Sequence, residues 1–206
     1  MEKQRKEKES RDWLVALEKA GIERRYRDCT FEAMVARGIP SQVKSECMIA
    51  QHYAANVEEN VKNGCGLAML GPVGVMKTSM AVAIIQAGLK RGISGMFITM
   101  PSLLDTIFTL KDTSREELAS FERRLRTVGI LLLDDLGAEH TEGWVHTKID
   151  AIVSERYNRM KPILITSNLL PNQMEKTYTA RVFDRIKSTS DLILFDGKSL
   201  RRARSA

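Results

Sequence analysis

The stretch that decides the fold reads Gly71-Pro72-Val73-Gly74-Val75-Met76-Lys77-Thr78-Ser79. It matches the phosphate-binding pattern G-x-x-x-x-G-K-[ST] at every required position but one, where Met76 replaces the second glycine. An apolar run over 66–70 precedes it, and a helical pattern over 78–91 follows. A strand, a tight turn and a helix N-terminus together favour anion binding, because backbone N–H groups and the helix dipole face the ligand.

Residues 71–79 therefore form a candidate binding site for nucleotide phosphates. We expect Lys77 to reach the outer phosphates and the Thr78 hydroxyl to bind Mg²⁺. If Met76 has a positive φ, its side chain costs about 1–2 kcal/mol. That cost is roughly tenfold in affinity if it falls on binding. We expect ATP or ADP binding to be retained and hydrolysis to be slow.

Apolar runs at regular intervals predict the fold class. Helical stretches separate five such runs, at 67–70, 96–99, 130–133, 163–165 and 192–195. Continuous apolar strands alternating with helices are typical of a parallel sheet covered on both faces. The sequence thus predicts an α/β fold of three αβα layers with a five-stranded parallel sheet, preceded by a helical segment.

The chain is expected to divide into an N-terminal helical docking segment, 1–22, and an ATPase domain, 23–206. A helix is predicted over 2–20, with a short apolar stripe that could pack on its own domain or on a partner. A connector over 22–45 and one helix over 42–61 are expected to lead to the first strand.

Polar residues follow two of the predicted strands. Asp134 and Asp135 end the run at 130–133, and Asn168 follows the run at 163–165. Ligands of open α/β sheets bind at the carboxyl edge of the strands. We expect Asp134 to hold Mg²⁺, Asp135 to act as a general base, and Asn168 to bind the γ-phosphate or the attacking water. Asn168 could instead be a simple turn former.

Arginines near the C-terminus are candidates for phosphate contacts. Arg181 and Arg185 are four residues apart, so they share one helix face and could reach the phosphate of a neighbouring subunit. They could instead pair with Asp184 or Glu175. Arg201 follows the last strand and could return to the nucleotide of its own chain.

The net charge of +6 includes a basic end, Lys198, Arg201, Arg202 and Arg204. Such an end can attract nucleic acid or remain a solvated tail. Phe108 and Lys111 could stack and neutralise single-stranded DNA, although such a phenylalanine is more often core. Three separated cysteines and the lack of any apolar run near the ~18 residues of a membrane span favour a reduced, cytoplasmic protein without a membrane partner.

As a set, these stretches resemble the AAA+ ATPases of the DnaC/DnaI helicase-loader family and their IstB-type relatives. The resemblance is carried by AGIERRYRDCTF, GPVGVMKTS, ILLLDDLGAE, ILITSN, ARVFDRIK and LFDGKSLRR. It implies that Asp134 and Asp135 are the Walker B acids, Asn168 sensor I, Arg185 the arginine finger and Arg201 sensor II. It further implies ATP/ADP and Mg²⁺ as cofactors, self-association through Arg181 and Arg185, and contact with single-stranded DNA and a replicative helicase.

The leading hypothesis is an ATP-dependent DNA replication factor that acts as a helicase loader, with weak ATPase activity. An IstB-type transposition helper with the same fold stays open. A small-molecule P-loop kinase and a scaffold that binds nucleotide without hydrolysis are alternatives from other classes.

Overall fold

The computed structural model describes residues 1–137 and 143–201. At its centre lie five strands, β1 Gly66–Leu70, β2 Gly95–Thr99, β3 Ile130–Asp134, β4 Ile163–Ser167 and β5 Ser190–Leu194. They form one sheet in the order β2-β3-β4-β1-β5, and every neighbouring pair is parallel. The predicted five-stranded parallel sheet is confirmed, with the last strand beginning two residues earlier than its apolar run.

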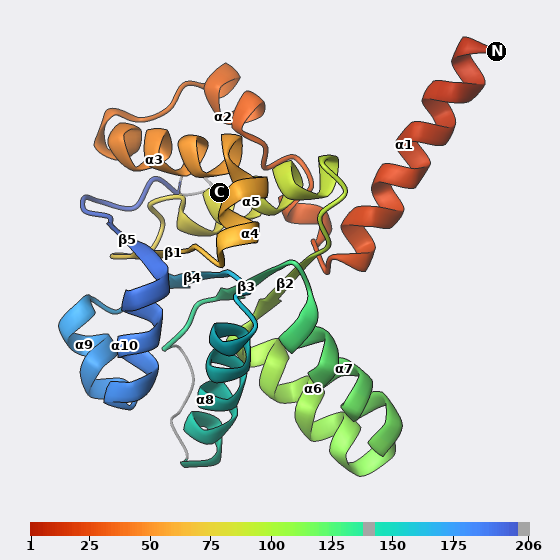
Figure 1. Cartoon of the computed structure of the whole chain (residues 1–206). Coiled ribbons are helices and arrows are strands. Elements are labelled where there is room, and N and C mark those ends of the chain that lie inside the picture. The colour runs from red at the N-terminus through yellow and green to blue at the C-terminus, as the bar shows by residue number, and fades with distance from the viewer. Residues whose placement is uncertain (138–142, 202–206) are drawn as a thin grey trace, which may run out of the picture.

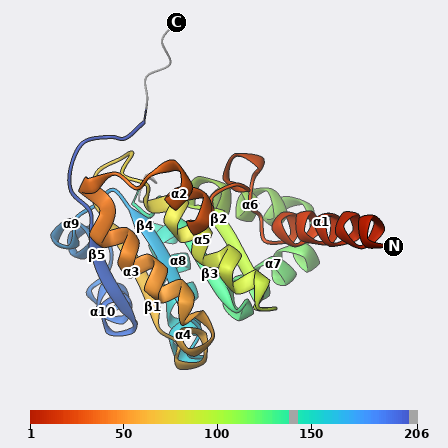
Figure 2. The same cartoon turned by 90° about the horizontal axis from the view of Figure 1, so that it is seen from above.

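Helices cover both faces of this sheet, as Figures 1 and 2 show. One face carries α2 Phe31–Arg37, α3 Lys44–Ala55, α4 Val57–Asn63, α5 Lys77–Lys90 and the C-terminal end of α1 Glu2–Lys19. The other face carries α6 Met100–Thr113, α7 Arg115–Thr127, α8 Gly143–Asn158, α9 Pro171–Thr177 and α10 Ala180–Thr189. Two hydrophobic clusters, one on each side of the sheet, complete the predicted three layers.

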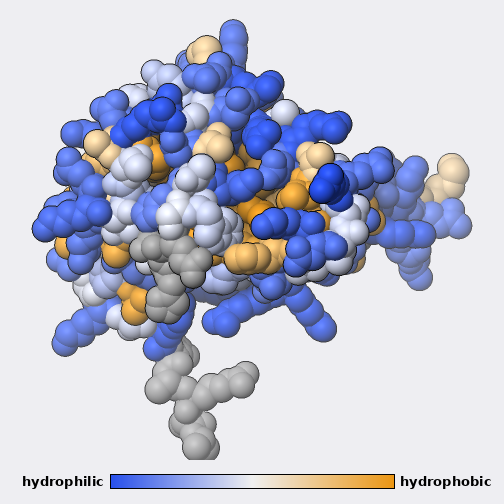
Figure 3. Space-filling model, turned by 90° about the horizontal axis from the view of Figure 1, so that it is seen from below, coloured by the Kyte–Doolittle hydropathy of each residue, from blue (hydrophilic) through white to orange (hydrophobic). Residues whose placement is uncertain are grey.

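Helix α1 projects from the domain and is held by its C-terminal end (Figures 1 and 2). Leu17 is buried in the first hydrophobic cluster, and Trp13 packs against it. The short apolar stripe expected on this helix consists of Trp13, Leu14 and Leu17, and its remaining member, Leu14, is 44% exposed. The projecting part is hydrophilic on the face that Figure 3 displays. Residues 20–40, which follow the helix, are called the lead-in segment. The Phe97 amide donates to the Ala20 carbonyl at 2.7 Å, so the start of this segment lies at the edge of β2.

Two predictions before the first strand were wrong in detail. The expected connector contains α2, which begins where the Thr30 hydroxyl accepts a hydrogen bond from the Ala33 amide at 3.1 Å. The single helix expected over 42–61 is two helices, α3 and α4, which meet at Asn56. The Asn56 side chain donates to the His52 carbonyl at 3.0 Å, a local bond that competes with helix continuation.

The strand order brings the polar strand ends together. Because β4 lies between β3 and β1, the chain after each of these strands emerges at the same edge of the sheet. Leu70 pairs with Ser167, and Leu133 pairs with Ile165. The loop after β1 and the polar residues after β3 and β4 are therefore neighbours.

Candidate nucleotide-binding site

The loop from Gly71 to Met76 connects β1 to α5, as the sequence pattern predicts. Gly71 and Gly74 have φ values of +141° and +83°. A Cβ at Gly71 would lie 2.3 Å from the Phe195 carbonyl oxygen, and one at Gly74 would lie 2.1 Å from the Ser199 hydroxyl. Both positions therefore need glycine for backbone conformation and for space.

Met76 has the left-handed conformation that makes glycine usual there, with φ +70° and ψ +10°. Because φ is positive, the Met76 side chain adds backbone strain of about 1–2 kcal/mol. Its side chain is half-buried, packs against the first hydrophobic cluster and lines the cavity beside Lys77. The substitution thus keeps the backbone shape of the loop and adds a flexible apolar group to it.

Lys77 is the first residue of α5 and is buried. Its ammonium group donates to the carbonyls of Gly71 at 2.8 Å and Pro72 at 2.7 Å, and to Oδ1 of Asn168 at 3.0 Å. Burial lowers the pKa of Lys77 to about 8, against the opposing effect of the two nearby aspartates. The loop and Asn168 thus hold the ammonium group of Lys77 in place at the wall of a cavity.

Thr78 and Asp134 form the candidate metal site. The Thr78 hydroxyl donates to Asp134 Oδ1 at 2.8 Å, and the Thr166 hydroxyl donates to the same oxygen at 2.6 Å. Burial raises the pKa of Asp134, and these two hydrogen bonds oppose that shift. One carboxylate beside one hydroxyl fits Mg²⁺, which binds through few protein oxygens, substrate phosphates and water.

Asp135 and Asn168 complete the cluster. Asp135 has a positive φ of +60°, a left-handed conformation that aspartate adopts more readily than most residues other than glycine. The Asn168 amide donates to Asp135 Oδ1 at 2.8 Å while its oxygen accepts from Lys77. Asn168 therefore links the candidate general base to the phosphate-loop lysine, a contact that a simple turn former would not need.

A cavity of about 740 Å³ opens over these residues. Its walls include Arg201, which sequence analysis predicted, together with lead-in residues that it did not assign to the site: Arg25, Tyr26, Asp28, Cys29, Met34 and Arg37. The motif AGIERRYRDCTF covers the first four of these residues and not Met34 or Arg37, and its residue types do not indicate a binding wall. Arg202 and Arg204 of the predicted basic end lie outside the described residues.

Gln86 holds the lead-in wall in place. It is 1% exposed on α5, and its amide nitrogen donates to the carbonyls of Tyr26, Arg27 and Cys29 at 3.0–3.2 Å. Helix α5, which begins with Lys77, thus also anchors the part of the cavity wall that includes Tyr26 and Cys29.

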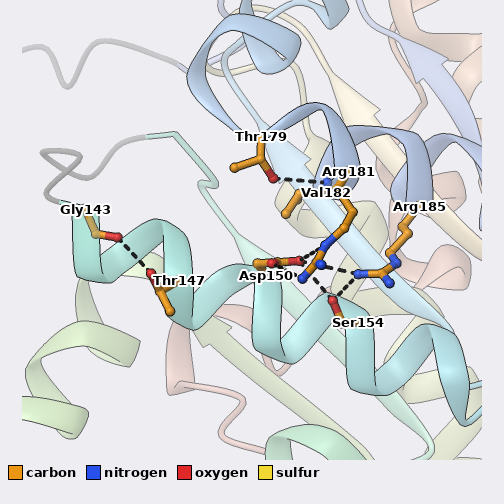
Figure 4. Close-up of polar contacts among 8 residues, drawn as sticks. All are labelled: Gly143, Thr147, Asp150, Ser154, Thr179, Arg181, Val182 and Arg185. Carbon is orange, nitrogen blue, oxygen red and sulfur yellow. Dashed lines mark hydrogen bonds and ion pairs between the residues drawn. The ribbon is translucent and has the colours of Figure 1, made fainter.

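Arg181 and Arg185 do not line this cavity. The expectation that they might pair with Asp184 or Glu175 is wrong, because both pair with Asp150 on the neighbouring helix α8 (Figure 4). Sequence spacing could not reveal this partner, which lies 31 residues before Arg181.

Phe108, the candidate DNA contact, is 52% exposed on α6, and its ring meets the Trp144 ring edge-on at 4.7 Å between centroids. Lys111 is exposed one helical turn further on. Neither residue is part of the nucleotide cavity. Within 1–137 and 143–201, no helix is long and apolar enough to cross a membrane.

A phosphate loop, a lysine, two acids and a polar strand end around one cavity define a P-loop nucleotide-binding site on an AAA+ fold. Residues 48–206 match the IstB-like ATP binding protein family, and the chain belongs to that family.

Two curated relatives are replicative helicase loaders. DnaI of Bacillus subtilis is 28% identical over 152 residues, which cover 67% of this chain and 48% of DnaI. DnaC of Escherichia coli is 27% identical over 187 residues, which cover 89% of this chain and 73% of DnaC. The match thus spans about half the length of DnaI. A crystal structure of the DnaC helicase loader superposes with a TM-score of 0.75 at 24% identity, covering 84% of this chain and all of that chain.

Proposed function

We propose that this chain is an ATP-dependent DNA replication factor that delivers or remodels a replicative helicase on single-stranded DNA. The observation that carries the proposal is the contact network of Lys77, Asn168 and Asp135 beside the Thr78–Asp134 pair. These are the groups that a nucleotide switch needs to distinguish ATP from ADP.

In this proposal, Lys77 and the backbone of 71–79 bind the phosphates, and Arg201 contacts them from the far side of the cavity. Thr78 and Asp134 hold Mg²⁺, which neutralises phosphate charge when it is bound. Asp135 accepts the proton of the attacking water, and Asn168 orients that water or the γ-phosphate. Met76 makes the ATPase slow without preventing binding.

Arg185, with Arg181 beside it, contacts the phosphates bound to a neighbouring copy. The position of both arginines outside their own cavity supports this arrangement, because they cannot serve the nucleotide of the same chain from there. ATP would then favour the assembled state, and hydrolysis would release it. The segment 1–22 is proposed as the docking element for the helicase, since α1 projects away from the ATPase domain (Figure 2).

Single-stranded DNA is the proposed nucleic-acid ligand. Phe108 offers an exposed aromatic face, and Lys111 adds a cation on the same side of α6. Phe108→Ala should weaken the binding of a fluorescent oligothymidylate by about tenfold, since one stacked base contributes about 1–3 kcal/mol. Unchanged affinity would show that DNA, if bound, contacts another surface.

Nucleotide binding is tested by titrating a fluorescent ATP analogue with Mg²⁺. Lys77→Ala should abolish binding, whereas Asp135→Asn should bind normally and lose hydrolysis. Wild-type protein that binds no nucleotide would refute the proposed switch. The loading role is tested by asking whether the protein increases the amount of replicative helicase bound to single-stranded DNA in the presence of ATP.

A second candidate is an ATPase that assists a transposase, which is favoured by the match of residues 48–206 to the IstB-like family. The two functions share the nucleotide site and differ in the partner. ATP-dependent co-sedimentation with a purified transposase, and not with a helicase, would select this second function.

A further inference from the structure

Helices α8 and α10 are joined by a polar cluster built around one carboxylate, that of Asp150 (Figure 4). Arg181 donates to Asp150 through Nε at 3.2 Å and also through an Nη group, so it pairs with both carboxylate oxygens. Arg185 Nη1 lies 3.4 Å from Asp150 Oδ1 and donates to the Ser154 hydroxyl. Ser154 in turn donates to Asp150 Oδ1 at 2.9 Å. Arg181, Arg185 and Ser154 thus all contact the same carboxylate, that of Asp150 on α8.

The two arginines are held in different ways. Arg181 forms a bidentate pair with Asp150 through one edge of its guanidinium, made of Nε and one Nη group, and its side chain is 63% exposed. Arg185 is only 22% exposed, and its guanidinium carbon lies 5.5 Å from the centre of the Tyr157 ring. Within 1–137 and 143–201, all hydrogen bonds of the Arg185 guanidinium use Nη1.

This asymmetry has a consequence for Arg185. A guanidinium carries five N–H donors in a fixed plane. Asp150 and Ser154 fix one corner of that plane, and the Tyr157 ring supports it by a cation–π contact. The Nε and Nη2 donors are left for another acceptor. A flexible arginine is thereby ordered before any phosphate reaches it, which lowers the entropy lost on binding.

We propose that Asp150 is a positioning residue, which acts with Ser154 to hold Arg185 ready for the phosphates bound to a second copy of this chain. The inference rests on the proposed function, since it requires that Arg185 acts between copies. It adds a residue on α8 that touches no nucleotide itself. Because Arg181 already neutralises the Asp150 carboxylate through two bonds, Asp150 makes only one longer contact with Arg185. This contact orients Arg185 and leaves its charge available for a phosphate.

The experiment compares full-length variants Asp150→Asn, Ser154→Ala, Arg185→Ala and the double variant Asp150→Asn with Arg185→Ala. Asp184→Asn is the matched control. It removes the same charge as Asp150→Asn, and Asp184 is exposed on α10 between the two arginines. Two quantities are measured: kcat for ATP hydrolysis at saturating ATP and high protein concentration, and the mass of the assembly formed with a non-hydrolysable ATP analogue. The affinity of dilute protein for the analogue is measured alongside.

We expect Asp150→Asn to lower kcat about tenfold, because misplacing a group by about 1 Å can cost up to a hundredfold. Ser154→Ala should have a smaller effect in the same direction. Analogue affinity of the dilute protein should be unchanged, and Asp184→Asn should match wild type. The double variant should be no worse than Arg185→Ala alone, since Asp150 acts through Arg185.

The outcomes separate the inference from the function on which it rests. If Arg185→Ala leaves both turnover and assembly intact, the proposed action between copies is wrong. If Arg185→Ala is impaired while Asp150→Asn and Ser154→Ala behave as wild type, only the positioning role is wrong. A higher kcat in Asp150→Asn would also overturn it, because Asp150 would then sequester the arginine. Additive losses in the double variant would point to general damage of α8.

Discussion

Replacing Met76 by glycine and by alanine separates backbone strain from side-chain packing. Met76 has φ +70° in the folded loop, so its strain of about 1–2 kcal/mol lowers the free energy of unfolding. Alanine keeps that strain and loses the packing of a half-buried methionine, about 1 kcal/mol by area. Glycine loses the same packing but relieves the strain, at a cost of roughly 0.5–1 kcal/mol in chain entropy.

Met76→Gly should therefore be more stable than Met76→Ala by about 0.5–1 kcal/mol, the reverse of the order found at ordinary helix positions. Urea denaturation of both variants, without nucleotide, gives this difference from the midpoints. An alanine variant at least as stable as the glycine variant would refute the reasoning. The nucleotide affinity of Met76→Gly reports separately on the side chain, which lines the cavity and should obstruct a phosphate more than glycine does.

Three further predictions concern buried polar groups. The affinity for ATP should fall by up to about fivefold between pH 8 and pH 9, because phosphates favour the protonated form of Lys77, whose pKa is about 8. Titrations of wild type and Lys77→Arg should differ, with a flat pH profile in the arginine variant. Gln86→Leu should lower the free energy of unfolding by about 1–3 kcal/mol, since it removes the donor shared by three carbonyls of the cavity wall. It should also weaken ATP binding in a nucleotide titration. Normal affinity would show that this wall does not contact the nucleotide. Arg156→Leu should lower the free energy of unfolding, measured by urea denaturation, by at least about 3 kcal/mol. This fully buried arginine donates to four backbone carbonyls near the end of α7 and the starts of β3 and β4. A loss below about 1 kcal/mol would show that water satisfies these carbonyls in the variant.

Much of the fold is local in the sequence and could be predicted from it. The strands are continuous apolar runs, and the phosphate loop stands between one of them and a helix, so their order determines where the polar strand ends meet. Helix α2 escaped prediction because it is short and depends on the Thr30 cap, and the break at Asn56 depends on a side-chain bond that competes with the helix.

The parts of the site that escaped prediction depend on contacts far apart in the chain. Asp150 has no sequence pattern that links it to Arg185, because helix α8 meets α10 only in the folded protein. The lead-in wall is likewise fixed by Gln86, which is 57 to 60 residues further along the chain. Spacing can reveal which residues share a helix face, but not which face lies opposite.

The chain after β5 returns to the phosphate loop, where the Leu200 amide donates to the Gly74 carbonyl at 2.9 Å and the Lys198 carbonyl accepts from Gln42 at 2.7 Å. An affinity tag or fluorescent protein fused directly behind Arg201 would pull on this tether and distort the pocket. A label at the other terminus is separated from the cavity by the 18 residues of α1, but it stands on the proposed docking segment 1–22, so it suits assays of nucleotide binding and not assays with a helicase.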